Sequence, residues 1–306
     1  MRQAFSLSRM SKDGKVDIGN RQSEIGNSQS SQSEIGNRKS EASIGIFDSG
    51  VGGLTVYRAI ERRLPNESLI YLGDTARIPY GVRSAATIER YALECARFVQ
   101  SRGVKAIVIA CNTASALAAN HLRAQCSVPV IGVIRPGSRR AVEQTRNGHI
   151  GVIATESTVA SGAYERTMLA IRSGLEITSR ACPLFVPLAE EGWLNHPVTF
   201  QVAEEYLAVL RSSQVDTLVL GCTHYPILRP VIERTLGDQI KYVDSGEAVA
   251  DTLANLLEED GLARISAQPR TEEFYVTDSA ARFRRVAELF LGRSLESVET
   301  VELGIV

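Results

Sequence analysis

The chain has 306 residues, and its 34 Lys and Arg residues nearly balance its 35 Asp and Glu residues, giving a formal net charge of -1 at pH 7. At roughly 100 to 200 residues per domain, this length predicts about two domains. The balanced charge argues against a protein that binds nucleic acid through bulk positive charge, because such domains usually carry a strongly basic face.

No apolar run approaches the roughly 18 residues that a membrane-spanning helix needs, and the N-terminus lacks the apolar core of a signal peptide. We therefore expect a cytoplasmic protein with no membrane partner. The cysteines are odd in number, widely spaced and without a CxxC motif, which indicates neither a disulfide framework nor a zinc finger. They are Cys95, Cys111, Cys126, Cys182 and Cys222.

Residues 1–42 differ in composition from the rest of the chain. Ser, Gln, Asn, Gly, Glu and Arg dominate, and a short unit recurs as IGNRQSE at 18–24, IGNSQS at 25–30 and IGNRKSE at 35–41. Such a segment has too little apolar surface to offset the entropy that it would lose on ordering. The composition therefore predicts a disordered low-complexity tail.

From Ser43 onward, apolar runs of strand length alternate with helical patterns. Runs of Val, Ile and Leu without polar alternation are typical of parallel strands covered by helices on both faces. The alternation predicts an α/β fold with doubly wound parallel sheets. The expected strands are 44–47, 68–73, 105–110, 129–134, 149–154, 216–221 and 240–244. The expected helices are 54–63, 84–101, 114–125, 158–172, 199–212 and 246–258.

The glycine-rich turn at 48–53 follows the first expected strand. Glycines at such a place let backbone N–H groups approach an anion at the positive end of a helix. The turn is neither a dinucleotide fingerprint nor a P-loop, because position 55 is Thr and no Gly-Lys-Ser/Thr occurs. It fits a carboxylate or small polar ligand, or else a tight strand-to-helix turn with no ligand.

Two cysteines also follow expected strands. Ligands of parallel sheets bind beyond the carboxyl ends of the strands, and there Cys111 follows KAIVIA and Cys222 follows DTLVLG. Each is expected to begin a turn into a helix, where the helix dipole favours a thiolate. AIVIACNTAS and TLVLGCTHYP look like one unit used twice, and IGIFDSG and IKYVDSG form a second matching pair. We infer two related α/β domains with one cysteine on each side of a shared cleft, which holds the active site.

Metal and pyridoxal chemistry are the alternatives to a thiol site. Cys222 and His224 could both ligate zinc, but a closed zinc site needs four closely spaced Cys or His ligands, and the four histidines are scattered. A pyridoxal enzyme needs a Schiff-base lysine, and neither Lys105 nor Lys241 follows a strand end. We expect no metal and no cofactor.

Six motifs in order, FDSGVGGL, GDTARIPYG, ACNTASA, PVIGVIRPG, GCTHYPIL and VDSG, resemble the glutamate racemase family of the aspartate/glutamate racemase superfamily. The resemblance runs from about Ile44 to Ala250 and implies two α/β domains, with hinges at the IRPG turn, 134–137, and the VDSG turn, 243–246. The implied domains are 43–135 with 244–306, and 136–243, preceded by the tail 1–42.

The resemblance implies a cofactor-independent enzyme, often a homodimer, that interconverts L-glutamate and D-glutamate and supplies D-glutamate for peptidoglycan. Cys111 and Cys222 match the family's catalytic pair, in which the first thiol deprotonates the D substrate and the second the L substrate. Residues implied to assist proton transfer are Asp48, Glu190 and His224. Residues implied to hold the substrate are Asp48, Ser49, Tyr80, Gly81, Asn112, Thr113, Thr155, Thr223 and His224.

Two other functions share part of this pattern. A racemase that acts on aspartate or hydantoins would have the same two cysteines, but the local motifs favour glutamate. A binding module with this fold would need neither cysteine, so the intact pair favours an enzyme. Some glutamate racemases are reported to inhibit DNA gyrase, which leaves gyrase open as a partner, with no direct contact to nucleic acid expected.

Overall fold

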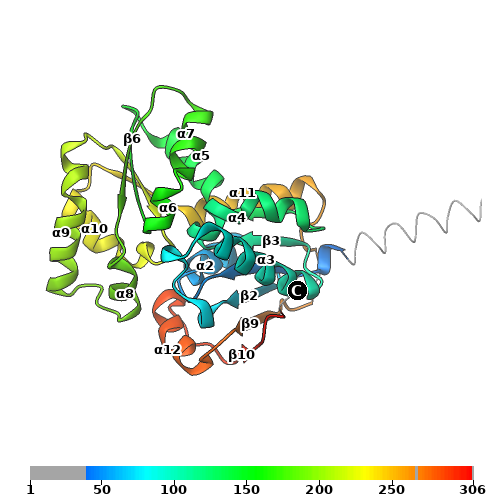
Figure 1. Cartoon of the computed structure of the whole chain (residues 1–306). Coiled ribbons are helices and arrows are strands. Elements are labelled where there is room, and N and C mark those ends of the chain that lie inside the picture. The colour runs from blue at the N-terminus through cyan, green and yellow to red at the C-terminus, as the bar shows by residue number, and fades with distance from the viewer. Residues whose placement is uncertain (1–38, 266–267, 305–306) are drawn as a thin grey trace, which may run out of the picture. The chain divides into compact units, whose positions relative to one another are not determined.

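The fold contains two parallel β-sheets, each flanked by helices (Figure 1). The structure, a computed structural model, describes residues 39–265 and 268–304. Sheet A has the strand order β10-β9-β2-β1-β3-β4, sheet B has the order β6-β5-β7-β8, and every strand pair is parallel. The strands are β1 (Ile44–Asp48), β2 (Leu69–Gly73), β3 (Ala106–Ile109), β4 (Val130–Gly132), β5 (His149–Ala154), β6 (Glu176–Ala181), β7 (Thr217–Gly221), β8 (Lys241–Asp244), β9 (Glu272–Val276) and β10 (Glu299–Thr300).

Helices lie between successive strands in the chain, because parallel strands need a long crossover connection. Within residues 39–265 and 268–304, no helix is long and apolar enough to cross a membrane. The α-helices are α2 (Leu54–Arg63), α3 (Ala85–Ser101), α4 (Asn112–Gln125), α5 (Ile134–Gln144), α6 (Glu156–Ala160), α7 (Ala163–Ile171), α8 (Phe185–Glu190), α9 (Pro197–Ser212), α10 (Arg229–Leu236), α11 (Ser245–Glu259) and α12 (Ala280–Leu291). The described residues also form the short 3₁₀ helices η1 (Thr75–Arg77), η2 (Tyr80–Val82) and η3 (Tyr225–Leu228).

Both faces of sheet A are covered, because successive side chains of a strand point to opposite faces. Ile44 and Ile46 of β1 belong to a buried cluster with residues of α2, α11 and α12. Phe47 of the same strand belongs to a second cluster with residues of α3 and α4. In sheet B, Ile150 and Val152 of β5 lie in a third cluster with residues of α5 and α7. Burial on both faces explains why the apolar runs of these strands lack polar alternation.

The seven expected strands are all present, whereas β6, β9 and β10 were not expected. Strand β6 reads EITSRA and is only partly buried, so it lacks the apolar run that marks the other strands of its sheet. The expected helix 158–172 is instead two helices, α6 and α7, because Gly162 takes a left-handed conformation with φ of 61° between them. Helices α5, α8, α10 and α12 were also not expected.

The IRPG segment was expected to be a turn, but residues 134–137 form the first turn of α5, and a hinge at this place stays a prediction. Pro136 is compatible with that position, since the first N–H groups of a helix have no acceptor within the helix. The VDSG segment, 243–246, is likewise part of a strand and a helix rather than a turn. Asp244 ends β8 and caps α11, with its Oδ1 accepting a hydrogen bond of 2.7 Å from the backbone N–H of Gly246.

The order β6-β5-β7-β8 of sheet B repeats the order β2-β1-β3-β4 within sheet A. Strands β3 and β7 are therefore equivalent, and the cysteines that follow them, Cys111 and Cys222, occupy equivalent places. The other expected match, IGIFDSG with IKYVDSG, is wrong. IGIFDSG contains β1, whose equivalent in sheet B is β5, whereas IKYVDSG contains β8, whose equivalent in sheet A is β4. The true counterpart of Ser49, which follows β1, is Thr155, which follows β5.

The predicted tail falls mostly outside the described residues, which begin at Lys39. Its last residues contact the folded part: the backbone carbonyl of Ser40 accepts a hydrogen bond of 2.7 Å from Lys105 Nζ, and Glu41 forms an ion pair of 3.1 Å with Arg264. The Lys105 ammonium is buried and also forms an ion pair with Glu67. The folded part therefore includes residues that the sequence assigned to the tail.

Two truncations should differ in stability. Removing residues 1–38 should leave the melting temperature nearly unchanged, because that segment offers few apolar residues for docking. Removing residues 1–42 also deletes an acceptor of a buried ammonium, a loss of about 1 to 3 kcal/mol, and each kcal/mol lowers the melting temperature of a chain of this size by roughly 2 to 4 °C. Calorimetry of both proteins checks this, and equal melting temperatures would contradict it.

Candidate active site

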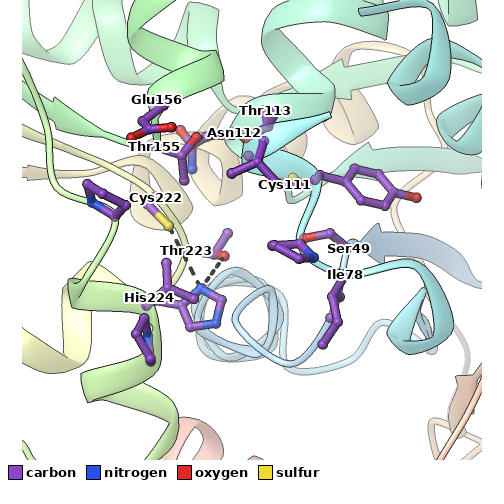
Figure 2. A pocket seen from close by; sticks show the side chains of 18 of the residues that line it. Ser49, Ile78, Cys111, Asn112, Thr113, Thr155, Glu156, Cys222, Thr223 and His224 are labelled. Atoms are coloured by element: carbon purple, nitrogen blue, oxygen red, sulfur yellow. Dashed lines mark hydrogen bonds between the residues drawn. The ribbon is translucent and has the colours of Figure 1, made fainter. Parts of the chain in front are cut away.

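A cavity of about 310 Å³ is lined by residues that follow strands of both sheets. Every residue that the sequence assigned to the site lines this cavity except Asp48. Figure 2 shows Cys111 and Cys222 on opposite sides of the cavity, with Thr223 and His224 on the side of Cys222. The two sheets thus bring together residues that are more than 100 positions apart in the chain.

Cys111 follows β3 and is the N-cap of α4. Its sulfur accepts a hydrogen bond of 3.5 Å from the backbone N–H of Ala114 and a further one from the side chain of Ser49. Burial raises the pKa of this thiol to about 12, and the negative charge of Asp48 adds to the rise. Cys111 is therefore a neutral thiol at pH 7, which is the form of a proton donor.

Cys222 lies beside an imidazole that is held by a carboxylate. His224 Nδ1 is 3.8 Å from Cys222 Sγ and 3.5 Å from Thr223 Oγ1, and His224 Nε2 is 3.1 Å from Glu190 Oε1 (Figure 2 draws the first two contacts). Burial alone would lower the pKa of His224, but the hydrogen bonds to Cys222 and Glu190 outweigh it and raise the pKa to about 10.

The contact between His224 and Glu190 also changes the pKa of the Glu190 carboxylate. Burial is the largest single influence and tends to raise the pKa of Glu190, but the hydrogen bond to His224 and the positive charges of His224 and Arg282 together outweigh it, and the pKa is lowered. Arg282 of α12 lies 3.5 Å from the other oxygen of Glu190 and acts in the same direction. At neutral pH the arrangement is therefore a carboxylate, an imidazolium and the Cys222 sulfur in a row.

Asp48 lies behind the wall of the cavity rather than in it. It is fully buried, its Oδ2 accepts a hydrogen bond of 2.9 Å from the backbone N–H of Gly50, and its Oδ1 has no partner among the described residues. Burial raises its pKa, and the positive charge of His224 partly opposes the rise. Asp48 can thus influence both His224 and Cys111 through charge.

The glycine-rich turn serves close packing. A Cβ atom on Gly52 would lie 2.4 Å from His224 Nδ1 and 2.5 Å from Thr223 Oγ1, distances that real Cβ atoms do not adopt. A side chain on Gly53 would similarly meet Asp48. The N–H of Gly50 is already taken by Asp48. Of the two interpretations of this turn, the packed strand-to-helix turn accounts for the glycines at 52 and 53, because it brings the backbone against His224.

Tyr80 lines the cavity, but its hydroxyl is directed into a buried network. The hydroxyl donates to Asp74 Oδ2, and Asp74 also pairs with Arg77 at 2.7 Å and accepts from Thr277 Oγ1 at 2.9 Å. The Tyr80 hydroxyl is therefore already bonded to Asp74. The network fixes the loop that supplies one wall.

Hydroxyl groups from the two halves meet at the cavity. Thr113 Oγ1, at the start of α4, lies 2.9 Å from Thr155 Oγ1 and 3.1 Å from Thr158 Oγ1, and the last two are 2.9 Å apart. Gly81 packs against Thr155, because a Cβ atom there would lie 2.9 Å from the Thr155 Cβ. These contacts place the expected binding residues Gly81, Thr113 and Thr155 in one cluster.

Sequence reasoning missed the apolar part of the wall. Such groups keep water away from the reacting atoms, and their only signal in the sequence is proximity to recognised motifs, as in RIPYG and CPLFVP. Further lining residues outside the predicted set are Gly50, Ile78, Pro79, Val82, Glu156, Pro183, Val186 and Pro187. The sequence reasoning also missed Tyr164, a buried tyrosine of α7 whose hydroxyl donates to Asn112 Oδ1 at 2.7 Å.

Chemically, the cavity offers two sulfur atoms from opposite sides, an imidazole beside one of them, and several N–H and O–H donors. That set suits proton removal and proton return at one carbon atom. Among residues 39–265 and 268–304, no three His, Cys, Asp or Glu side chains lie close enough together to hold a metal ion. No lysine is among the residues that line the cavity.

Comparisons with known proteins identify the family that the chain resembles. The family model for Asp/Glu/hydantoin racemases matches residues 44–253. A glutamate racemase of Geobacter metallireducens is 51% identical over 260 residues, covering 85% of this chain and 96% of the relative. Two solved glutamate racemases, an isoform from Bacillus anthracis and a D-glutamate complex from Francisella tularensis, superpose with TM-scores of 0.83 and 0.81. Each is 39% identical and covers 86% of this chain and 98% of its own.

Proposed function

The chain belongs to the glutamate racemase family within the Asp/Glu/hydantoin racemases, and we propose that it interconverts L-glutamate and D-glutamate by a two-thiol mechanism. The observation that carries the proposal is the pair of cysteines at equivalent strand ends, on opposite sides of one cavity. Inversion of an α-carbon needs a base on one face and an acid on the other, and two thiols in opposite protonation states supply both.

For L-glutamate, Cys222 as thiolate removes the α-proton and Cys111 as thiol returns its own proton to the opposite face. The product is D-glutamate, and the thiols have exchanged states. The raised pKa of Cys111 supports its role as the donor in this direction. An imidazolium at His224 donates toward the Cys222 sulfur and so balances its negative charge. For D-glutamate the same steps run in reverse.

The α-proton of an amino acid is only weakly acidic, so the site must stabilise the carbanion that forms. Preorganised donors in a site that excludes water are the usual means. Candidates are the hydroxyl of Thr223 and the backbone N–H groups at the start of α4. The apolar residues of the wall strengthen these interactions because they lower the local dielectric constant.

Glutamate is the proposed substrate because the relatives named above are glutamate racemases and one of them holds D-glutamate. By the same family resemblance, the product would serve peptidoglycan synthesis, and the enzyme would work without a cofactor as a homodimer. Aspartate and hydantoins are the substrates of the nearest rival enzymes. Inhibition of DNA gyrase stays a prediction about a partner.

Circular dichroism tests the proposed function directly. Purified protein incubated with either L-glutamate or D-glutamate should make the optical signal decay to zero, and L-aspartate under the same conditions should keep its signal. A binding module would leave all three signals constant. Decay with aspartate but not with glutamate would instead identify the rival racemase.

A further inference from the structure

We propose that Tyr164 is a positioning residue that orients the Asn112 amide, so that its Nδ2 faces a carboxylate of the substrate. This inference rests on the proposed function, because it needs a substrate with a carboxylate in the cavity. Tyr164 itself does not line the cavity. It acts through Asn112, which does.

Tyr164 joins three segments of the chain. Its hydroxyl donates to Asn112 Oδ1 at 2.7 Å and lies 3.0 Å from Ser245 Oγ, which in turn donates to the backbone carbonyl of Leu220 at 3.3 Å. Tyr164 is on α7, Asn112 begins α4, and Ser245 begins α11. One hydroxyl therefore links the half that carries Cys222 to the first turn of the helix that Cys111 caps.

The Asn112 amide is satisfied on one side only. Its Oδ1 accepts from Tyr164, whereas its Nδ2 is buried and has no partner among the described residues. A buried donor without a partner is unfavourable and is commonly found where a ligand supplies the acceptor. Since Asn112 lines the cavity between the two cysteines, a substrate carboxylate is the acceptor that the site lacks.

The tyrosine ring reaches this position because Gly221, the last residue of β7, has no side chain. A Cβ atom on Gly221 would lie 3.1 Å from the Tyr164 ring and 2.8 Å from the backbone oxygen of Ile153. Burial raises the pKa of Tyr164, so its hydroxyl stays protonated and stays a donor. Because this hydroxyl donates to Oδ1, the Nδ2 end of the amide is the one left for the substrate.

Tyr164→Phe removes the donor and keeps the ring. The amide can then rotate and present Oδ1, which repels a carboxylate, so KM for glutamate should rise about tenfold, equivalent to about 1.4 kcal/mol. A contact that holds the carboxylate equally in the ground state and the transition state contributes to KM rather than to kcat, so kcat should change by less than about threefold. Both values are measured for L-glutamate and D-glutamate, with the melting temperature as a check of folding.

A double-mutant cycle separates positioning from a merely structural role. In an Asn112→Ala background, Tyr164→Phe should change KM by less than about twofold, because the group that it orients is gone. Tyr225→Phe is the matched control: its buried hydroxyl bonds the carbonyl of Cys182, and its effect should be the same with or without Asn112.

Each outcome decides between the two proposals. An unchanged KM in Tyr164→Phe, an effect confined to kcat, or the same change in both backgrounds would overturn the positioning role while the parent enzyme remains an active racemase. A parent protein that does not racemise glutamate would overturn the proposed function, and the inference with it. A tenfold rise in KM that disappears in the Asn112→Ala background supports it.

Discussion

Replacing either Cys111 or Cys222 with alanine should abolish racemisation in both directions. Each direction uses one thiol as base and the other as acid, so neither can work alone. L-glutamate and D-glutamate have equal free energies, and kcat/KM must therefore fall by the same factor for both. Optical activity followed over hours should stay constant with either variant.

Solvent deuterium tests the same mechanism without a mutation. The proton returned to the α-carbon comes from the thiol that did not remove the first, and that thiol exchanges with solvent between turnovers. Racemisation in D₂O should therefore place deuterium at the α-carbon of the inverted product, while the recovered substrate gains deuterium more slowly. Mass spectrometry of the separated enantiomers measures both.

Cys182 supplies the control for the two cysteine variants. It is buried like the proposed catalytic pair, but it does not line the cavity. Cys182→Ala should retain glutamate turnover and change only stability, through lost packing. A Cys222→Ala protein that racemises at the parental rate, or a product without α-deuterium after complete turnover in D₂O, would contradict the two-thiol mechanism.

The sequence predicted the buried strands well because burial on both faces leaves a continuous apolar run. Strands β1, β3 and β7 are of this kind, and the residues after them form the site. Strand β6 escaped prediction because it is only partly buried and carries Glu176, Thr178 and Arg180. Helix α5 was hidden because Pro136 and Gly137, which usually mark turns, lie in its first turn.

The site shows a similar limit. Motifs identify residues that touch the cavity, such as Cys111 and Thr223, because family resemblance acts on short segments. They do not identify contacts between distant segments, and the Tyr164 hydroxyl on Asn112 joins residues 52 positions apart. Motifs also do not distinguish a residue that lines the cavity from one that lies behind the lining. Asp48 was therefore expected to hold the substrate directly, although it does not line the cavity.

The second large effect should come from the carboxylate and imidazole beside Cys222. Glu190→Gln and His224→Asn should each lower kcat by about 10²- to 10⁴-fold, the usual contribution of general acid–base assistance, with folding intact. His224 Nδ1 is the group next to the Cys222 sulfur, and Glu190 holds the other ring nitrogen. Glu191→Gln is the matched control, because this neighbouring carboxylate is exposed and does not line the cavity.

The pH dependence should separate the two roles. The pKa of His224 is raised to about 10, so its protonated form, and the activity that needs it, is present at neutral pH and is lost as the pH rises through about 10. Glu190→Gln removes one of the groups that raise this pKa, and the alkaline limb of kcat/KM should therefore move to lower pH. In His224→Asn that limb should disappear. Parental rates in both variants, or an alkaline limb that Glu190→Gln leaves in place, would show that the pair does not assist Cys222.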